Sequence, residues 1–336
     1  MGTTLPALIG QLQALEQHYL PDFDTSLARL RVTPQNTVVV PDLGELLMTE
    51  WSAGQLSRIL GYQPKWFKGI SAADQAQETN KRLGMADRAM RLRVARPPDG
   101  HGRHGGVLRA IVGQTYTSIP DSVVATALLD ALGSAEPELA VVRSAVTDRS
   151  TSFVVRLGDA FQVGGPGNVG EVAGTLTVRN SDVGYASLMA CLSLLRLACK
   201  NGMLLPDPGA FLMRRRHLGL DRKTITSDLK ERLHDLPARL HRGAHALEAA
   251  SHLAVENVEQ EIRAALREAR IPLSTLPQVK AAYEQEPHAS VWGVSQALAR
   301  AAQGMTPEGG LATEMAAGTY VRRAVERAES NVTRGA

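Results

Sequence analysis

Apolar positions along this chain follow two spacings, and the change from one to the other divides it into three parts. In the first part, residues 1–86, apolar residues recur at helical spacing near Leu8, through residues 43–60 and again through residues 72–83. The apolar run Val38–Val40 is the exception and predicts a short buried strand. We therefore expect an N-terminal helical segment.

The second part, residues 87–223, contains runs typical of strands, in which apolar and polar residues alternate or apolar residues are continuous. The first two runs flank a turn-rich tip at residues 97–106, which indicates a hairpin. A helix is expected at residues 122–132, with Asp121 or Ser122 as its N-cap. Together the runs predict an antiparallel or mixed sheet of about five strands, at residues 88–94, 107–112, 139–146, 152–157 and 174–178.

Residues 182–198 form a continuous apolar stretch that predicts a long helix packed on one face of this sheet. The preceding Asn180–Asp182 suits a helix N-cap, and Asn201–Gly202 suits a helix stop. Capping alone explains Asp182, although an active-site carboxylate is the alternative. Cys191 and Cys199 would lie about 12 Å apart on such a helix, too far to form a disulfide with each other.

The third part, residues 224–336, has leucines at a spacing close to seven, with Pro237 as an expected interruption. Further helices are expected at residues 279–283, 291–302 and 312–328. These helices could form a subunit interface or could close back on the sheet of their own chain. The whole chain is therefore predicted to be α+β, with the central sheet and long helix between an N-terminal helical segment and a helical C-terminal region.

Composition narrows the partner class only slightly. Among 336 residues, 21% are charged and 44% hydrophobic, which is ordinary for a globular protein, and only 4% are aromatic. The net charge of +3 is too small to drive nucleic-acid binding as an overall property, so an anionic partner needs a local patch. The two cysteines are interpreted as reduced thiols, which suits a cytoplasmic protein. No secretory signal and no bilayer-spanning apolar run is recognised.

Basic residues gather in two places, on the expected hairpin and just beyond the expected long helix. Guanidinium groups in a row can follow a phosphate backbone, because each offers paired donors and neutralises one phosphate. Tyr116, in a short loop beside threonines, is the best candidate for an exposed ring on which a base stacks. Solvated arginines that pair with carboxylates are the alternative. The candidate phosphate ligands are Arg91, Arg93, Arg109, Arg214, Arg215, Arg216 and Lys223.

Several catalytic and metal chemistries lack their sequence signatures. The glycine-rich residues 164–170 lack the Gly-Lys-Ser/Thr ending of a phosphate loop and do not lead into a helix. His241 and His245 are four residues apart but lack the glutamate of a zinc-protease motif. No Ser, His and Asp group has a local signature of nucleophilic catalysis. No catalytic residue, metal ligand or cofactor is therefore assigned.

The residues Arg179-Asn180-Ser181-Asp182-Val183-Gly184 and Lys200-Asn201-Gly202-Met203 bound the most distinctive segment of the chain. Together with several other segments, in order, this segment resembles the phage- and plasmid-encoded family known as domain of unknown function 932. The resemblance implies a mobile genetic element, where replication and recombination proteins are common. The other matching segments are Glu50–Leu56, Arg109–Val112 with Tyr116 and Ile119-Pro120, Arg196–Cys199, Arg216-His217, Trp292–Val294 with Ala297-Leu298, and Glu314–Gly318.

The expected order of hairpin, strand and long helix is also similar to the fold of single-strand annealing proteins, which is an analogy of topology alone. The leading expectation is a non-catalytic, homo-oligomeric protein that binds single-stranded DNA and anneals strands. The first alternative is a protein-interaction or structural factor that uses its helices as an oligomer interface. The second alternative is an enzyme with a dispersed site that includes Asp182 and His217.

Overall fold

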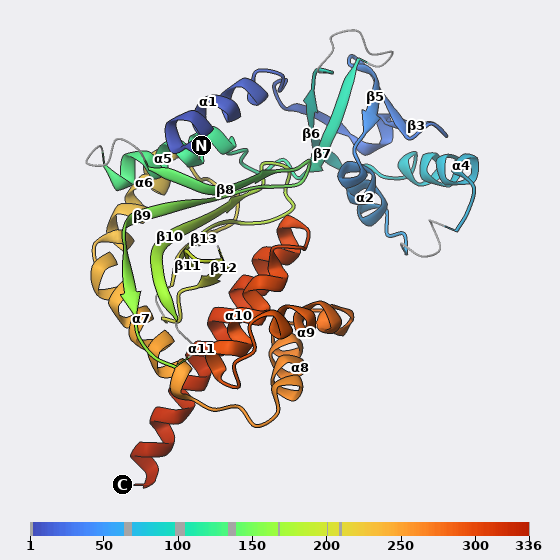
Figure 1. The fold of residues 1–336 in the computed structure, drawn as a ribbon. Helices are drawn as coiled ribbons and strands as arrows, with labels where there is room; N and C mark the ends of the chain where they lie inside the picture. Colours follow the sequence, from blue (N-terminus) through green and yellow to red (C-terminus); the bar gives the residue numbers. More distant parts are fainter. Residues whose placement is uncertain are drawn as a thin grey trace.

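The chain folds into two β-sheets with helices packed around them, as a computed structural model shows (Figure 1). The structure describes residues 3–63, 69–97, 105–133, 139–166, 169–199, 201–207 and 210–335. The predicted α+β class is confirmed. The predicted single sheet of about five strands is an underestimate, because the described strands form one seven-stranded and one six-stranded sheet. The hairpin at residues 88–112 belongs to the smaller sheet, and residues 98–104 at its tip lie outside the described residues.

The smaller sheet is built from the N-terminal third of the chain, in the order β2-β6-β7-β5-β4-β3. Its strands pair antiparallel except for β5 and β7, which run parallel. The helices α2 (Glu50–Ile59) and α4 (Ala72–Leu83) pack against it around a core of their own. Its strands are β2 (Phe23–Ser26), β3 (Arg31–Val32), β4 (Thr37–Val40), β5 (Gly44–Met48), β6 (Ala89–Ala95) and β7 (Gly106–Val112).

The larger sheet is antiparallel throughout, in the order β1-β8-β9-β10-β11-β12. The strand β13 pairs with the first half of β11, so β12 and β13 share one edge of the sheet. Its strands are β1 (Thr3–Thr4), β8 (Ala140–Val146), β9 (Thr151–Val163), β10 (Gly170–Asn180), β11 (Leu188–Arg196), β12 (Asn201–Leu204) and β13 (Phe211–Arg215).

Helices cover both faces of the larger sheet (Figure 1). On one face lie α1, α5, α6 and α7, and Gly174 of β10 lets the Leu240 side chain of α7 approach the backbone closely. On the other face lie α10 and α11, while α8 and α9 pack behind them. The helices are α1 (Leu5–Glu16), α5 (Asp121–Leu132), α6 (Arg222–Leu233), α7 (Leu236–His252), α8 (Val258–Glu268), α9 (Leu276–Gln285), α10 (Val291–Ala302) and α11 (Pro307–Gly335).

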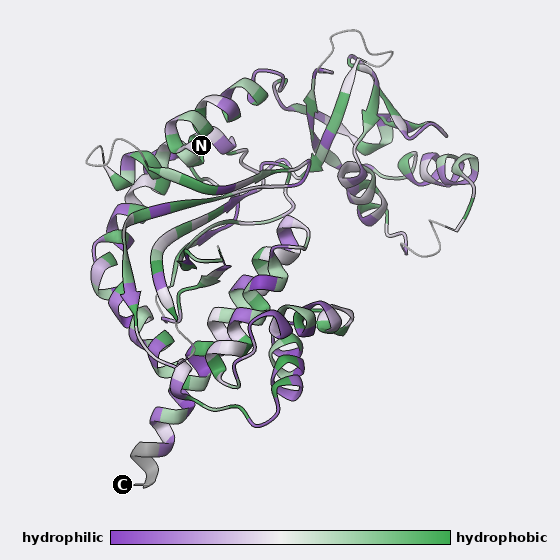
Figure 2. Cartoon of the chain, in the orientation of Figure 1, coloured by the Kyte–Doolittle hydropathy of each residue, from purple (hydrophilic) through white to green (hydrophobic). Residues whose placement is uncertain are grey.

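The predicted long helix at residues 182–198 is wrong, because this stretch contains a turn followed by strand β11. All nine residues of β11 are buried, and the strand has neighbours on both sides and helices over both faces. A strand buried on both faces has a continuous apolar sequence, which a buried helix also has. In Figure 2 the neighbouring strands β9 and β10 are banded with hydrophilic and hydrophobic residues, so the continuous apolar run is particular to β11.

The caps and the stop assigned around that helix are corrected with it. Asn180 ends β10, and Ser181 and Asp182 lie in the turn to β11, so none of them caps a helix. Asn201–Gly202 begins strand β12, and Lys200 lies outside the described residues. The predicted side-chain cap at α5 is also absent, since the helix begins after Pro120 without such a hydrogen bond.

The N-terminal and C-terminal parts confirm some predictions and correct others. Residues 43–60, predicted as one helix, are strand β5 and then α2, which Thr49 caps by accepting a hydrogen bond from the Ser52 amide. Residues 1–86 therefore contribute strands as well as helices. In the C-terminal region, α7 restarts at the predicted Pro237 interruption, α10 has the predicted bounds, and α11 continues beyond the predicted residue 328. The predicted domain boundaries stay a prediction.

Candidate nucleic-acid interface

The turn between β10 and β11, residues 181–185, inserts against the smaller sheet and joins the two sheets. The main-chain oxygen of Val183 accepts hydrogen bonds from Trp51 Nε1 at 2.9 Å and from Gln55 Nε2 at 3.0 Å. The Gln55 side chain also accepts a hydrogen bond from the Ile111 amide of β7 at 2.9 Å. Helix α2 thus holds the turn and the smaller sheet at the same point.

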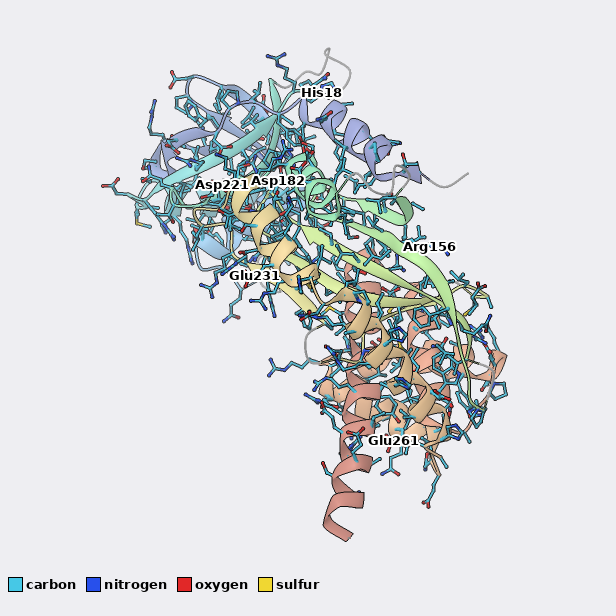
Figure 3. All side chains as sticks on the ribbon, turned by 90° about the vertical axis from the view of Figure 1, so that its left-hand side faces the viewer. His18, Arg156, Asp182, Asp221, Glu231 and Glu261 are labelled. Carbon is cyan, nitrogen blue, oxygen red and sulfur yellow. The ribbon has the colours of Figure 1, made fainter. Side chains whose placement is uncertain are left out.

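Asp182 is the charged centre of this joint (Figure 3). Its two carboxylate oxygens accept a bidentate pair from Arg109, each at 3.0 Å. Arg93 lies 3.3 Å from the same carboxylate, donates to the Asp182 main-chain oxygen and contacts Asp22 at 3.1 Å. The side chains of Asp182, Arg93 and Arg109 are only 6%, 7% and 13% exposed. Burial alone would lower the pKa of Arg109, but attraction by Asp182 keeps it raised.

Tyr116 belongs to the same joint. Its ring stacks on His217 with centroids 5.1 Å apart and an interplanar angle of 4°. Its hydroxyl donates to the Ser181 main-chain oxygen at 2.7 Å and accepts from the Gly184 amide at 3.1 Å. Burial raises the pKa of Tyr116 and lowers the pKa of His217. A stacked ring with a satisfied hydroxyl is fixed in place.

Three of the predicted nucleic-acid ligands therefore point inward. Arg93 is buried and pairs with Asp22 and Asp182, Arg109 is only 13% exposed and pairs with Asp182, and the ring of Tyr116 is stacked on His217. The prediction that these side chains contact phosphate and base is therefore corrected. A phosphate could reach the two guanidinium groups only by displacing the buried carboxylate of Asp182. The residues of the dispersed enzyme site, Asp182 and His217, are likewise engaged in internal contacts.

Arg91 lies at the outer side of the same region. It forms a bidentate ion pair with Asp24, with distances of 2.8 and 3.1 Å. This hydrogen-bonded partner raises the pKa of Arg91. Arg91 also approaches the Tyr116 main-chain oxygen, so the two basic regions adjoin at Tyr116 and His217. Its charge is nevertheless balanced by Asp24.

The remaining predicted ligands lie at one edge of the larger sheet, on or just after β13 and on α6, which packs against it. Arg214 and Arg215 end strand β13, Arg216 follows, and Lys223 lies in the first turn of α6. All four side chains are exposed, and we call this group the cationic edge. Arg215 pairs with Asp228 of α6 at 2.9 Å. Across the described ranges, the side chains of Arg214, Arg216 and Lys223 form no ion pair or hydrogen bond.

Arg179, which was not among the predicted ligands, lies on the larger sheet beside the cationic edge. Arg179 of β10 and Arg214 of β13 both lie across from Met189 of β11. The Nε atom of Arg179 is buried and has no hydrogen-bond partner. The signal in the sequence was a charged residue directly after the predicted strand Gly174–Val178, which contains no other charged residue.

Metal-binding groups and membrane-spanning helices were also sought among the described residues. In the described part of the chain, no three His, Cys, Asp or Glu side chains are grouped so that they could hold a metal ion. Among the helices described, none is long and apolar enough to cross a membrane.

Comparisons with known proteins add no relative. No protein-family model matches the chain, and neither a curated protein nor a solved structure is significantly similar to it. The resemblance to the domain of unknown function 932 family stays a prediction from the quoted segments.

Proposed function

We propose that this protein binds single-stranded nucleic acid without catalysing a reaction, and that the cationic edge contacts the phosphates. The observation that carries the proposal is the exposed group of Arg214, Arg216 and Lys223, whose charges no described carboxylate balances. Charges placed in this way along an edge strand can each contact one phosphate and release its counterion. Arg215 adds a further guanidinium that Asp228 only partly neutralises at the surface.

An aromatic ring is available on the same strand. Phe211 of β13 is 37% exposed, three residues before Arg214. Stacking of a base on this ring would favour unpaired over duplex nucleic acid, because bases in a duplex are already stacked. Phe211 therefore takes the place of Tyr116 in the proposal. With phosphate contacts in the majority, binding should tolerate many sequences and weaken as salt rises.

The cationic edge can be tested by charge removal. In the variant R214A/R215A/R216A, affinity for a labelled single strand should fall for all sequences. The slope of log affinity against log salt should become shallower by about 2, since each lost phosphate contact removes roughly 0.7. Fluorescence anisotropy at several salt concentrations measures both quantities.

The matched control removes the same charge elsewhere. Arg31 of β3, Arg267 of α8 and Arg327 of α11 are exposed and lie on elements other than β13 and the helix α6 that packs against it. The variant R31A/R267A/R327A should retain the affinity and the slope of the unaltered protein. An unchanged affinity in the R214A/R215A/R216A variant would refute the cationic edge as the binding surface.

The wider context is part of the same proposal. A phage or plasmid origin and strand annealing would follow from the family resemblance, and annealing would be carried out by a homo-oligomer. The free cysteines, Cys191 and Cys199, suit a reducing cytoplasmic compartment. A mass measurement of the free protein tests the oligomer. Absence of nucleic-acid binding at both low and moderate salt would instead favour a protein-interaction role for the helices.

A further inference from the structure

A cavity of about 650 Å³ lies between the larger sheet and the helices α10 and α11. Hydroxyl groups from three adjacent strands line its sheet side: Ser152 of β9, Thr175 and Thr177 of β10, and Ser193 of β11. Thr177 and Ser193 are hydrogen-bonded to each other at 3.0 Å. Apolar side chains, including those of Val154 and Leu195, complete this wall. The cavity thus offers both hydrogen-bonding groups and an apolar surface.

Arg214 and Arg179 lie on the same face of the sheet, just beyond one end of the cavity. Arg179 is two residues after Thr177 and directly opposite Ser152, and both of these residues line the cavity. Residues two apart on a strand, and residues opposite each other on paired strands, share a face. Arg214 lies on this face as well, because it is opposite Met189, which is in turn opposite Arg179. Two strand spacings of about 4.8 Å separate them, within reach of two arginine side chains holding one anion.

The charge of this pair is not balanced. Burial lowers the pKa of Arg179; Tyr185 opposes this shift and the positive charge of Arg214 adds to it. Glu308, a nearby carboxylate, accepts a hydrogen bond from Ser150 at 3.2 Å. One carboxylate against two guanidinium groups leaves a net positive charge. The positive end of the α11 dipole adds to it, since this helix begins at Pro307, which lines the cavity.

The opposite part of the cavity is lined by an ion pair. Arg143 of β8 donates two hydrogen bonds of 2.7 Å to Glu314 of α11, whose side chain is 5% exposed. Gly202 of β12 packs against the same carboxylate, which lies 3.1 Å from where a Cβ would stand. The two ends therefore differ. One has a satisfied ion pair, and the other has two cations with a single nearby carboxylate, Glu308.

We propose that this cavity binds a phosphate monoester, with its phosphate on Arg179 and Arg214 and its body along the hydroxyl-lined wall. A monoester carries close to two negative charges at neutral pH, which complements two guanidinium groups. The volume lies within the range of small-molecule sites. This inference goes beyond the proposed function, because it concerns a separate small ligand and a residue, Arg179, that the cationic edge does not include.

Isothermal titration calorimetry of the full chain tests the site with three probes: a nucleoside 5′-monophosphate, the same nucleoside without phosphate, and inorganic phosphate. The monophosphate should bind roughly tenfold or more tightly than either other probe, because only it uses both the guanidinium groups and the wall. The variant R179Q should lose roughly tenfold or more of this affinity. The control R232Q removes an equal charge from α6 and should leave it unchanged.

A second variant keeps the arginines and blocks the space. Ser152→Leu places a larger side chain on the cavity wall next to Arg179 and should cause a similar loss. Equal binding of nucleoside and monophosphate, no heat with any probe, or full affinity in both variants would overturn the proposal. The R179Q variant should still bind a single strand, whereas R216Q should weaken strand binding alone. The two proposals can thus fail separately.

Discussion

Two buried carboxyl groups beside the joint have opposite surroundings. Asp182 pairs with Arg109 and Arg93, whereas Asp121 has only neutral donors. Asp121 accepts hydrogen bonds from the Thr151 hydroxyl at 2.6 Å and from Asn180 Nδ2 at 2.7 Å. Burial, together with repulsion by Asp182, raises the pKa of Asp121 to about 7. This group therefore changes its charge near neutral pH while the protein is folded.

Stability should consequently depend on pH through Asp121. The carboxyl group has a pKa of about 3.9 in an unfolded chain, so the folded state binds more protons between about pH 4 and pH 7. The free energy of unfolding should therefore decrease as pH rises through this window. The variant D121N carries no titrating group and should have a smaller decrease. Urea unfolding at pH 5 and pH 8 measures both proteins, and identical pH dependences would contradict the assignment.

The inward direction of Arg93 and Arg109 could not be predicted from the sequence. Both side chains alternate with apolar residues on their strands, as exposed arginines of a half-buried sheet do. They are covered by the turn that carries Asp182, which is 73 residues beyond Arg109, and Arg109 is also covered by the ring of Tyr19, whose centroid is 3.5 Å from the guanidinium carbon. Arg214 and Arg216 are outside, as expected, because no later segment covers the edge strand at their side chains.

At the scale of the element, β11 shows why one strand was predicted as a helix. Its residues are mainly Leu, Ala, Met and Ser, none of which is β-branched. Leu, Ala and Met have high helix propensity, so both composition and continuity favoured a helix. Pairing with β10 on one side and with β12 and β13 on the other overrides that preference. Strand pairing of this kind is non-local and leaves little trace in a single segment.

Elements with a local signature were predicted correctly. The hairpin of β6 and β7 has alternating strands around a turn-rich tip. Helix α10 begins after Ser290, whose side chain accepts a hydrogen bond from the Gly293 amide, and its apolar face recurs at helical spacing. Caps, turns and periodicity are contained within the segment itself, which is why these predictions held.

The packing of α11 on β12 depends on a glycine. A Cβ at Gly318 would lie 1.9 Å from the main-chain oxygen of Leu204, which cannot move away as a flexible side chain could. Gly318→Ala should therefore displace the helix and reduce the free energy of unfolding by about 2 kcal/mol or more. Urea denaturation monitored by circular dichroism provides the measurement.

A glycine in an open part of a helix gives the control. At Gly54 of α2 the nearest atom to an added Cβ is Arg58 Nη2, 4.0 Å away. Gly54→Ala should leave stability unchanged or raise it by up to about 1 kcal/mol, since alanine favours a helix interior. Equal effects of the two substitutions would show that α11 does not approach β12 this closely.

At the scale of the molecule, the two sheets have largely separate cores joined at the turn of residues 181–185. Trp51 and Val183 form a small apolar cluster at this place, beside the ion pairs of Asp182. Matching segments of the family resemblance, Glu50–Leu56, Arg109–Val112 and Arg179–Gly184, meet here. Their convergence gives them a structural role in coupling the sheets, separate from any contact with nucleic acid.

This coupling predicts how the molecule unfolds when the joint loses its charge. Asp182→Asn keeps the size of the side chain but leaves Arg93 and Arg109 buried without a carboxylate between them, which should cost roughly 3–5 kcal/mol. Because the loss falls at the joint, the smaller sheet should melt before the larger one, and calorimetry should resolve two transitions, whereas the unaltered protein should have one. Asp24→Asn, which removes the half-exposed partner of Arg91, should retain the single transition. A single transition in D182N, shifted or not, would mean that the two sheets are coupled by contacts other than this ion-pair cluster.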